Sequence, residues 1–259
     1  MTFKPKLVAF DLDGTLAESK QRMEARMGEL LARLSQKMPV AVMSGAGFPQ
    51  FERQFLPALP ENATLERVYL FPDNAAQCFV WKDGKWRTHY DNAFTPVERE
   101  HILKELNKAM KETGFAEAPV RVWGERIEDR GAEIVFSGLG QEAPIEEKRK
   151  WDPTREKRQP LAEAIRQRLP EVSVGVNAAT SIDITRKGIT KAYGIKKLVE
   201  LSQISVSEML YVGDALQEGG NDAVVLKSGV KTHAVFGPKE TAALIESLLS
   251  EEKTASKKP

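Results

Sequence analysis

The sequence predicts an α/β protein in which a core built on a parallel sheet is interrupted by a smaller α+β domain. Three apolar runs, residues 7–10, 38–43 and 209–212, each lead into a polar or glycine residue. Such runs are typical of buried strands in a parallel sheet. The pattern stops near residue 90 and resumes near residue 187. A domain inserted into another explains this interruption better than two domains in series.

Composition places the chain among ordinary globular proteins, with 259 residues, 41% hydrophobic and 29% charged. Its net charge of +1 gives no overall attraction to nucleic acid or to a membrane surface, so we expect neither as a partner. No apolar run approaches the length of about 18 residues that a membrane span needs. The first residues also lack the apolar region of a secretion signal, so we expect a cytoplasmic protein.

The first expected strand carries the most informative motif. Residues 7–10 lead directly into Asp11-Leu12-Asp13-Gly14-Thr15. Open α/β sheets place their chemistry at the carboxyl ends of strands, so two carboxylates there suggest a metal site and a nucleophile. The alternative is a plain turn in which Asp11 caps the next helix.

The next elements continue the core. Apolar residues at helical spacing predict a helix over residues 24–34. The second strand leads into Ser44-Gly45-Ala46-Gly47, whose hydroxyl and backbone amides can bind a phosphate, although an ordinary turn fits equally well. The remaining elements expected in this half are a short helix over 50–56, a strand over 67–71, and a hairpin at Asp83-Gly84 with strands over 75–81 and 85–90.

The insertion is expected to form a small α+β domain. One helix begins at Thr95-Pro96, and another covers residues 161–169. The basic runs 148–150 and 155–158 are interspersed with acids and indicate a solvated helix face. Its expected strands are residues 120–123, 132–136, 172–176 and 181–185.

The α/β pattern returns from residue 189. A helix over 190–201 includes Lys191, which taken alone is more simply a solvated lysine. The strand over 209–212 leads into Gly213-Asp214, and Gly219-Gly220-Asn221-Asp222 follows. Taken alone, Asp214 could cap a helix and Asn221-Asp222 could form a turn. The last expected elements are a strand over 232–236, a helix over 240–249 and a disordered tail over 251–259.

Together these motifs are harder to explain as separate turns. Three strand ends of one core carry oxygen ligands, which suit Mg²⁺, a hard cation that prefers carboxylates and phosphate oxygens. The three histidines and the single cysteine, Cys78, lack metal-ligand spacing, and no P-loop sequence is present.

The motifs resemble those of the haloacid dehalogenase (HAD) superfamily of phosphotransferases. The likeness rests on residues 11–15, Ser44, Lys191 and residues 213–222. The insertion resembles the type-IIB cap of that superfamily, and the closest likeness, over residues 10–223, is to eukaryotic-type phosphomannomutases. It implies an HAD-like Rossmannoid core over residues 1–90 and 187–259 that carries catalysis, and a cap over residues 91–186 that carries specificity.

This resemblance implies a reaction through an aspartyl phosphate. Asp11 would be the nucleophile and Asp13 the general acid and base. Ser44 and Lys191 would contact the transferring phosphoryl group. The Mg²⁺ ligands that it implies, with the backbone carbonyl serving for Asp13, are Asp11, Asp13, Asp214, Asn221 and Asp222. The substrate-binding residues that it implies are Lys20, Gly45, Arg130, Ser181 and Asp183.

The expected cap departs from the mutase pattern at two positions, where Trp123 and Gln141 replace arginines. A mutase must hold a second phosphate in its cap, so we expect a phosphatase acting on a small phosphorylated metabolite such as a sugar phosphate. Phosphomannomutase, which interconverts mannose 1-phosphate and 6-phosphate, is the alternative, with Arg121 or Arg126 replacing the absent arginines. A non-catalytic module that binds a phosphorylated ligand or transmits a signal is a third possibility. The resemblance also implies a homodimer formed through the cap.

Overall fold

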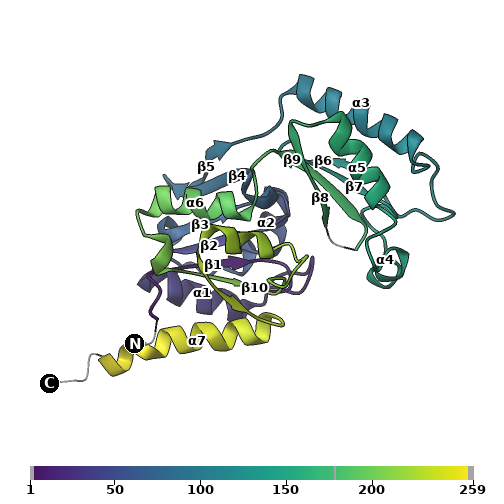
Figure 1. The fold of residues 1–259 in the computed structure, drawn as a ribbon. Coiled ribbons are helices and arrows are strands. Elements are labelled where there is room, and N and C mark those ends of the chain that lie inside the picture. Colours follow the sequence, from purple (N-terminus) through teal and green to yellow (C-terminus); the bar gives the residue numbers. More distant parts are fainter. Residues whose placement is uncertain (1–2, 178, 256–259) are drawn as a thin grey trace. The chain divides into compact units, whose positions relative to one another are not determined.

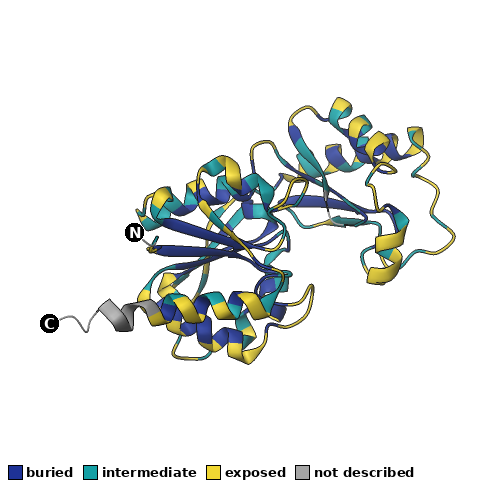
Figure 2. Cartoon of the chain, turned by 60° about the horizontal axis from the view of Figure 1, so that its bottom comes forward, coloured by how far each residue is buried: buried dark blue, intermediate teal, exposed yellow. Residues whose placement is uncertain are grey.

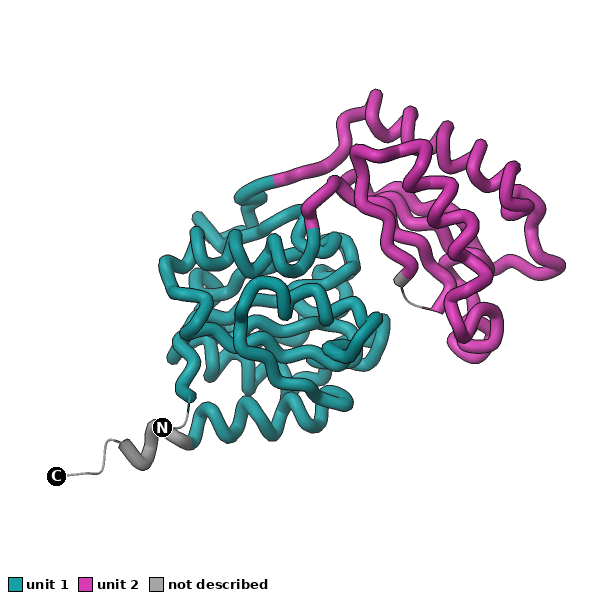
Figure 3. The backbone as a smooth tube through the Cα atoms, in the orientation of Figure 1, with its two compact units in different colours: residues 1–90, 190–259 teal, residues 91–189 magenta. Residues whose placement is uncertain are grey.

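The computed structural model of the chain describes residues 3–177 and 179–255. The chain divides into two compact units (Figure 3), the first comprising residues 1–90 and 190–259 and the second residues 91–189. The second unit is continuous in sequence and is inserted into the first. Each unit has its own sheet and its own hydrophobic core.

The first unit is built on a seven-stranded sheet with the order β11-β10-β1-β2-β3-β4-β5 (Figure 1). The strands from β11 to β3 are parallel, and β4 runs antiparallel to β3. The predicted α/β class with a parallel core sheet is thereby confirmed. The strands are β1 (Leu7–Asp11), β2 (Val40–Met43), β3 (Val68–Phe71), β4 (Gln77–Lys82), β5 (Lys85–Asp91), β10 (Met209–Gly213) and β11 (Lys231–Ala234).

Helices cover both faces of this sheet. Successive side chains of β1 point to opposite faces, so neighbouring residues of this strand pack against different helices. Val8 packs with Leu30 of α1 and Ile245 of α7 in one cluster. Leu7 packs with Ile195 of α6 in the other. Figure 2 shows the central strands buried between the two layers. The helices of this unit are α1 (Ala25–Lys37), α2 (Phe48–Gln54), α6 (Lys191–Ser202) and α7 (Pro238–Ala255), with a 3₁₀ helix at Ala223–Ser228.

The second unit is a four-stranded antiparallel sheet with the order β6-β7-β9-β8. Ile134 and Phe136 of β7 and Ile182 of β9 pack with the helices, so the alternate residues of these strands lie on the opposite face. The elements are α3 (Pro96–Glu112), β6 (Ile127–Asp129), β7 (Glu133–Ser137), α4 (Ile145–Trp151), α5 (Gln159–Arg168), β8 (Val172–Asn177) and β9 (Ser181–Arg186).

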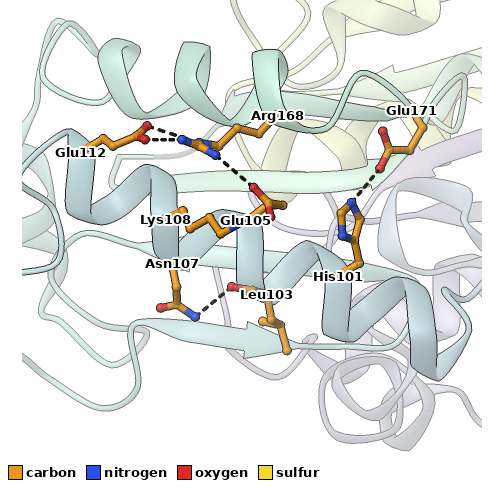
Figure 4. A network of polar contacts seen from close by, with 8 residues as sticks. All are labelled: His101, Leu103, Glu105, Asn107, Lys108, Glu112, Arg168 and Glu171. Atoms are coloured by element: carbon orange, nitrogen blue, oxygen red, sulfur yellow. Dashed lines mark hydrogen bonds and ion pairs between the residues drawn. The ribbon is translucent and has the colours of Figure 1, made fainter.

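Polar contacts fix helix α3 at its start and along its length. Thr95 caps it, with the Thr95 side chain and Glu98 forming a reciprocal capping box. Figure 4 shows Arg168 of α5 reaching two glutamates of α3. Its Nη1 donates to Oε2 of Glu105 at 3.0 Å, and Glu112 accepts from the same guanidinium. The two helices therefore form one layer over the sheet.

Three expectations about the elements are wrong. Residues 120–123 form no strand; Trp123 instead exchanges backbone hydrogen bonds with the loop at Leu139 and Glu142, and the strand comes after Gly124, whose φ is +69°. Arg158 does not lie on a solvated face, because it is fully buried against Asp152. Helix α7 continues to Ala255, so residues 251–255 are helical; residues 256–259 lie outside the described residues.

Within the described part of the chain, none of the helices combines the length and the apolar character that a bilayer crossing requires.

Candidate active site

Three carboxylates meet at the carboxyl edge of the core sheet. Asp11 ends β1, Asp214 follows β10, and Asp222 immediately precedes the 3₁₀ helix. One oxygen from each lies within 4.8 Å of the others, a spacing that suits a shared metal ion. Asp214 can lie this close to the end of β1 because residue 14 is a glycine. Its φ is +83°, and a Cβ there would lie 2.5 Å from Oδ2 of Asp214.

Lys191 completes this group from the first turn of α6. Thr190 caps the helix by accepting a hydrogen bond from the backbone N–H of Tyr193, which fixes where the helix starts. The buried Nζ of Lys191 donates to Oδ1 of Asp11 at 2.5 Å and to Oδ1 of Asp222 at 2.6 Å. A lysine that could have been solvated is therefore held between two acids.

Tyr211 is a member of this network that sequence reasoning missed. Its hydroxyl, buried in the middle of the sheet, donates to Oδ1 of Asp222 at 2.6 Å. The available signal was a tyrosine within an otherwise apolar buried strand, because a buried phenol needs a hydrogen-bond partner. Oδ2 of Asp222 accepts from the backbone N–H of Ala215 at 3.2 Å, so both oxygens of this carboxylate are held.

The network carries an excess of negative charge. Burial raises the pKa of Asp11 to about 7; Lys191 opposes that rise and Asp222 adds to it. Burial also disfavours the charged form of Asp222, but Lys191 outweighs it and holds the pKa of Asp222 below its usual value. The same two carboxylates keep the pKa of Lys191 above its ordinary range despite its burial.

Desolvation and the nearby Asp222 also raise the pKa of Asp214. Three acids facing one lysine form a donor set that fits a divalent cation with a preference for oxygen. Asn221, next to Asp222 in sequence, is exposed. The chemistry of the residues present therefore matches the magnesium expected from the sequence.

Asp13 is held by the backbone of Lys20 and by two glutamines of α2 that the sequence did not single out. Its Oδ1 accepts from the backbone N–H of Lys20 at 2.6 Å and from Nε2 of Gln54 at 3.1 Å. Its Oδ2 accepts from Nε2 of Gln50 at 3.2 Å. Lys20 makes its contact through the backbone, with a φ of +59°. The signal available for the glutamines was their i, i+4 spacing on a short helix directly after the Ser44 turn.

The Ser44 turn lies beside Asp11, because β1 and β2 are parallel with Asp11 opposite Met43. The Ser44 side chain is buried, and its Oγ accepts from the backbone N–H of Ala46 at 3.0 Å. The following loop supports this turn, since the backbone N–H of Asn74 donates to the carbonyl of Ser44 at 2.8 Å.

That supporting loop is itself strained. Residues Asp73, Asn74 and Ala75 have φ values of 49°, 54° and 69°. Three consecutive left-handed residues other than glycine are costly, and such strain persists only where the surroundings enforce it. Here it is enforced next to Ser44 and Gly45, the turn expected to bind phosphate.

The expected substrate-binding residues of the second unit lie on or beside its sheet. Arg130 donates from Nη2 to Glu128 at 2.7 Å and from Nη1 to Glu133 at 3.0 Å. Ser181 and Asp183 belong to β9, on the face opposite the helices. The structure thus gives Arg130 two carboxylate partners, one of which, Glu133, is only 1% exposed.

The two arginines considered as replacements in the cap both stack on aromatic rings. The guanidinium of Arg121 lies 4.8 Å from the centre of the Trp123 ring, and that of Arg126 lies 5.1 Å from the centre of the Phe136 ring. Phe136 belongs to the helix-covered core, so this contact sets Arg126 against packed side chains.

Comparison with known proteins gives a consistent family. The model of the family described as eukaryotic phosphomannomutase matches residues 27–251. A phosphomannomutase of Encephalitozoon cuniculi is 26% identical over 247 residues, which cover 93% of this chain and 92% of that protein. A phosphomannomutase of Spinacia oleracea is 25% identical over 252 residues, covering 93% and 95%.

Solved structures share the fold at lower identity. A haloacid dehalogenase-like hydrolase from Bacteroides thetaiotaomicron superposes with a TM-score of 0.59 at 19% identity, covering 95% of this chain and all of that one. This similarity confirms the predicted HAD-like fold of the chain.

Proposed function

Because the chain belongs to the eukaryotic phosphomannomutase family, and with it to the HAD class of phosphoryl-transfer enzymes, we propose that it hydrolyses a small phosphorylated metabolite through a phosphoryl group carried on Asp11. The observation that carries the proposal is the buried network in which Lys191 bridges Asp11 and Asp222 beside Asp214. This family membership also rejects the third alternative, a non-catalytic binding module.

The first half of the proposed reaction transfers the phosphoryl group to the protein. A carboxylate oxygen of Asp11 bonds to phosphorus as the bond from phosphorus to the leaving oxygen breaks, and Asp13 gives its proton to that oxygen. Lys191 and the Ser44 hydroxyl offset the charge of the phosphoryl oxygens. Backbone N–H groups of the turn at Gly45 add donors to the same end.

The second half restores the protein. Asp13 takes a proton from water, and the water oxygen bonds to phosphorus while the bond to Asp11 breaks, releasing inorganic phosphate. The ligands proposed for Mg²⁺ are Asp11, Asp214, Asp222 and the backbone carbonyl of Asp13, with Asn221 in or near its shell. When bound, the ion offsets the repulsion between an anionic carboxylate and an anionic phosphate.

We assign the choice of phosphoryl acceptor to the second unit. Arg130, Ser181 and Asp183 there are proposed to contact the substrate, and Lys20 of the first unit to approach its phosphate. A mutase must also hold a second phosphate. Arg130, however, is already paired with the carboxylates of Glu128 and Glu133, and Trp123 and Gln141 occupy positions where the mutases have arginines. These features favour water as the acceptor.

Phosphomannomutase activity is the second candidate, and the comparisons favour it. Curated relatives that match over more than nine-tenths of their length carry that name. In this case the phosphoryl acceptor is a second hydroxyl of the sugar. With the mutase activity we also propose a homodimer formed through the second unit.

A substrate panel separates the two candidates. Purified protein with Mg²⁺ is incubated with sugar monophosphates, and released phosphate is measured. In parallel, conversion of mannose 1-phosphate to mannose 6-phosphate is followed with and without a hexose bisphosphate. We expect phosphate release that is lost in Asp11→Asn; bisphosphate-dependent conversion without release would establish the mutase instead.

A further inference from the structure

We propose that Gln50 and Gln54 of α2 are positioning residues that hold Asp13 for proton transfer and leave its Oδ2 as the oxygen that exchanges the proton. The inference rests on the proposed function, in which Asp13 serves as acid and base. It assigns roles to two side chains that lie outside the sequence motifs and whose hydrogen bonds go to Asp13 and to each other.

The two oxygens of Asp13 are engaged unequally. Oδ1 accepts two N–H groups, from the Lys20 backbone at 2.6 Å and from Gln54 at 3.1 Å, which uses both of its lone pairs. Among the described residues, Oδ2 has one hydrogen bond, from Gln50 at 3.2 Å. One lone pair of Oδ2 is therefore left to carry a proton to a leaving oxygen or to receive one from water.

The glutamines also fix each other. Nε2 of Gln50 donates to Oε1 of Gln54 at 2.6 Å, so each amide hydrogen of Gln50 has its own acceptor. This bond turns the NH₂ group of Gln54 toward Asp13 and its carbonyl away from it. Turning the Gln54 amide over would set its carbonyl against the carboxylate, which is electrostatically unfavourable.

The backbone of Gln54 is fixed as well. Its side chain is 3% exposed, and its carbonyl accepts from the N–H of Met23 at 2.9 Å. A buried amide anchored at both ends has little freedom to follow a moving carboxylate. General acid–base groups act only when placed within hydrogen-bond reach, and a displacement of about 1 Å can cost about 100-fold in rate.

The test separates proton transfer from the rest of the reaction. The first-step rate is measured in single turnovers as release of the leaving group, from a sugar phosphate and from 2,4-dinitrophenyl phosphate. A sugar alkoxide needs a proton to leave, whereas dinitrophenolate does not. The variants are Gln54→Met, which keeps length and removes the donor, and Gln50→Met, at a half-buried position where folding is less at risk.

Gln36→Met is the matched control, because Gln36 donates through Nε2 to the carbonyl of Asn62 elsewhere in the same unit. We expect both test variants to slow release from the sugar phosphate by about 10- to 100-fold and release of dinitrophenolate by less than about threefold. The control should change neither rate.

Equal losses for both substrates, or an unchanged rate with the sugar phosphate, would overturn the positioning role. Wild-type protein that releases neither leaving group would overturn the proposed function, and this inference with it; the dinitrophenyl ester distinguishes that outcome from a failure confined to the glutamines.

Discussion

Among single residues, Asp222 shows how hydrogen bonds fix the orientation of a side chain in the site. Both of its oxygens are engaged, by Lys191 and Tyr211 on one side and by the Ala215 backbone on the other. A carboxylate bonded in this way cannot rotate freely. It therefore presents a fixed edge to Asp11 and Asp214.

Tyr211→Phe tests how much the hydrogen bond from Tyr211 to Asp222 stabilises the fold. Loss of a buried hydrogen bond to a charged group should lower the free energy of unfolding by about 1.5–3 kcal/mol in urea titrations with EDTA. Tyr90→Phe is the control, because the Tyr90 hydroxyl donates to the neutral carbonyl of Ala75 at 2.9 Å and should cost about 1 kcal/mol. A smaller loss for Tyr211→Phe than for Tyr90→Phe would contradict the assignment.

Asp11 should give the metal-free protein an unusual pH dependence. Its pKa is about 7 in the folded protein against 3.8 as the reference value, so between these pH values the folded state holds a proton that the unfolded chain has released. Stability should therefore rise as pH falls from about 7 to about 4.

The measurement is the free energy of unfolding in EDTA for the wild type and for Asp11→Asn, which cannot titrate at this position. We expect the wild type to gain stability relative to the variant as the pH falls through this window. A difference that stays constant, or that shrinks toward low pH, would rule out a raised pKa at Asp11.

At the scale of elements, the second unit depends on a buried ion pair between α4 and α5. Nε of Arg158 donates to Oδ2 of Asp152 at 2.7 Å, and Nη1 donates to the carbonyl of Ser181 at 2.6 Å. This guanidinium ties the start of α5 to the start of β9, the strand that carries Ser181 and Asp183.

Arg158→Met should leave Asp152 buried without its cation and cost about 3–5 kcal/mol in the free energy of unfolding. The double variant with Asp152→Asn should recover part of that loss. Lys150→Met, which removes an exposed pair with Glu147 in the same unit, is the control and should cost at most about 1 kcal/mol. Urea unfolding measures all three; an Arg158 variant no worse than the control would refute the buried pair.

The elements also show how far sequence reasoning reaches. The core strands could be predicted, because a strand covered on both faces must be apolar throughout, as residues 7–10 and 209–212 are. The strand at Ile127–Asp129 could not, because it is short and its residues are only partly buried. The apolar residues at 120–123 pointed to a strand in the wrong place.

The same limit applies to the candidate site. The sequence could predict Asp11, Asp214 and Lys191, because each lies at the end of a strand or the start of a helix at one edge of the sheet. Gln50 and Gln54 were not predicted, because their partner Asp13 is about forty positions away in sequence. Their i, i+4 spacing places them on one face of a helix, but it does not show what that face contacts. The burial of Arg158 was missed for a related reason, since its partner Asp152 lies in an irregular segment.

For the molecule as a whole, the proposed reaction requires that the first unit bind a divalent cation. Metal that binds the folded state alone raises stability by about 2.7 kcal/mol at 100 times its dissociation constant. Mg²⁺ should therefore raise the melting temperature of the wild type in thermal scans, and by much less in Asp214→Asn. If the wild type melts at the same temperature in Mg²⁺ and in EDTA, the first unit has no such metal site.

The residue that carries the phosphoryl group during turnover can be identified chemically. Protein turning over a phosphorylated substrate is quenched, treated with borohydride, which converts an aspartyl phosphate to homoserine, and digested for mass spectrometry. We expect homoserine at position 11, absent without substrate and absent in Asp11→Asn. Turnover that proceeds with unmodified Asp11, or with the modification at another residue, would contradict this expectation.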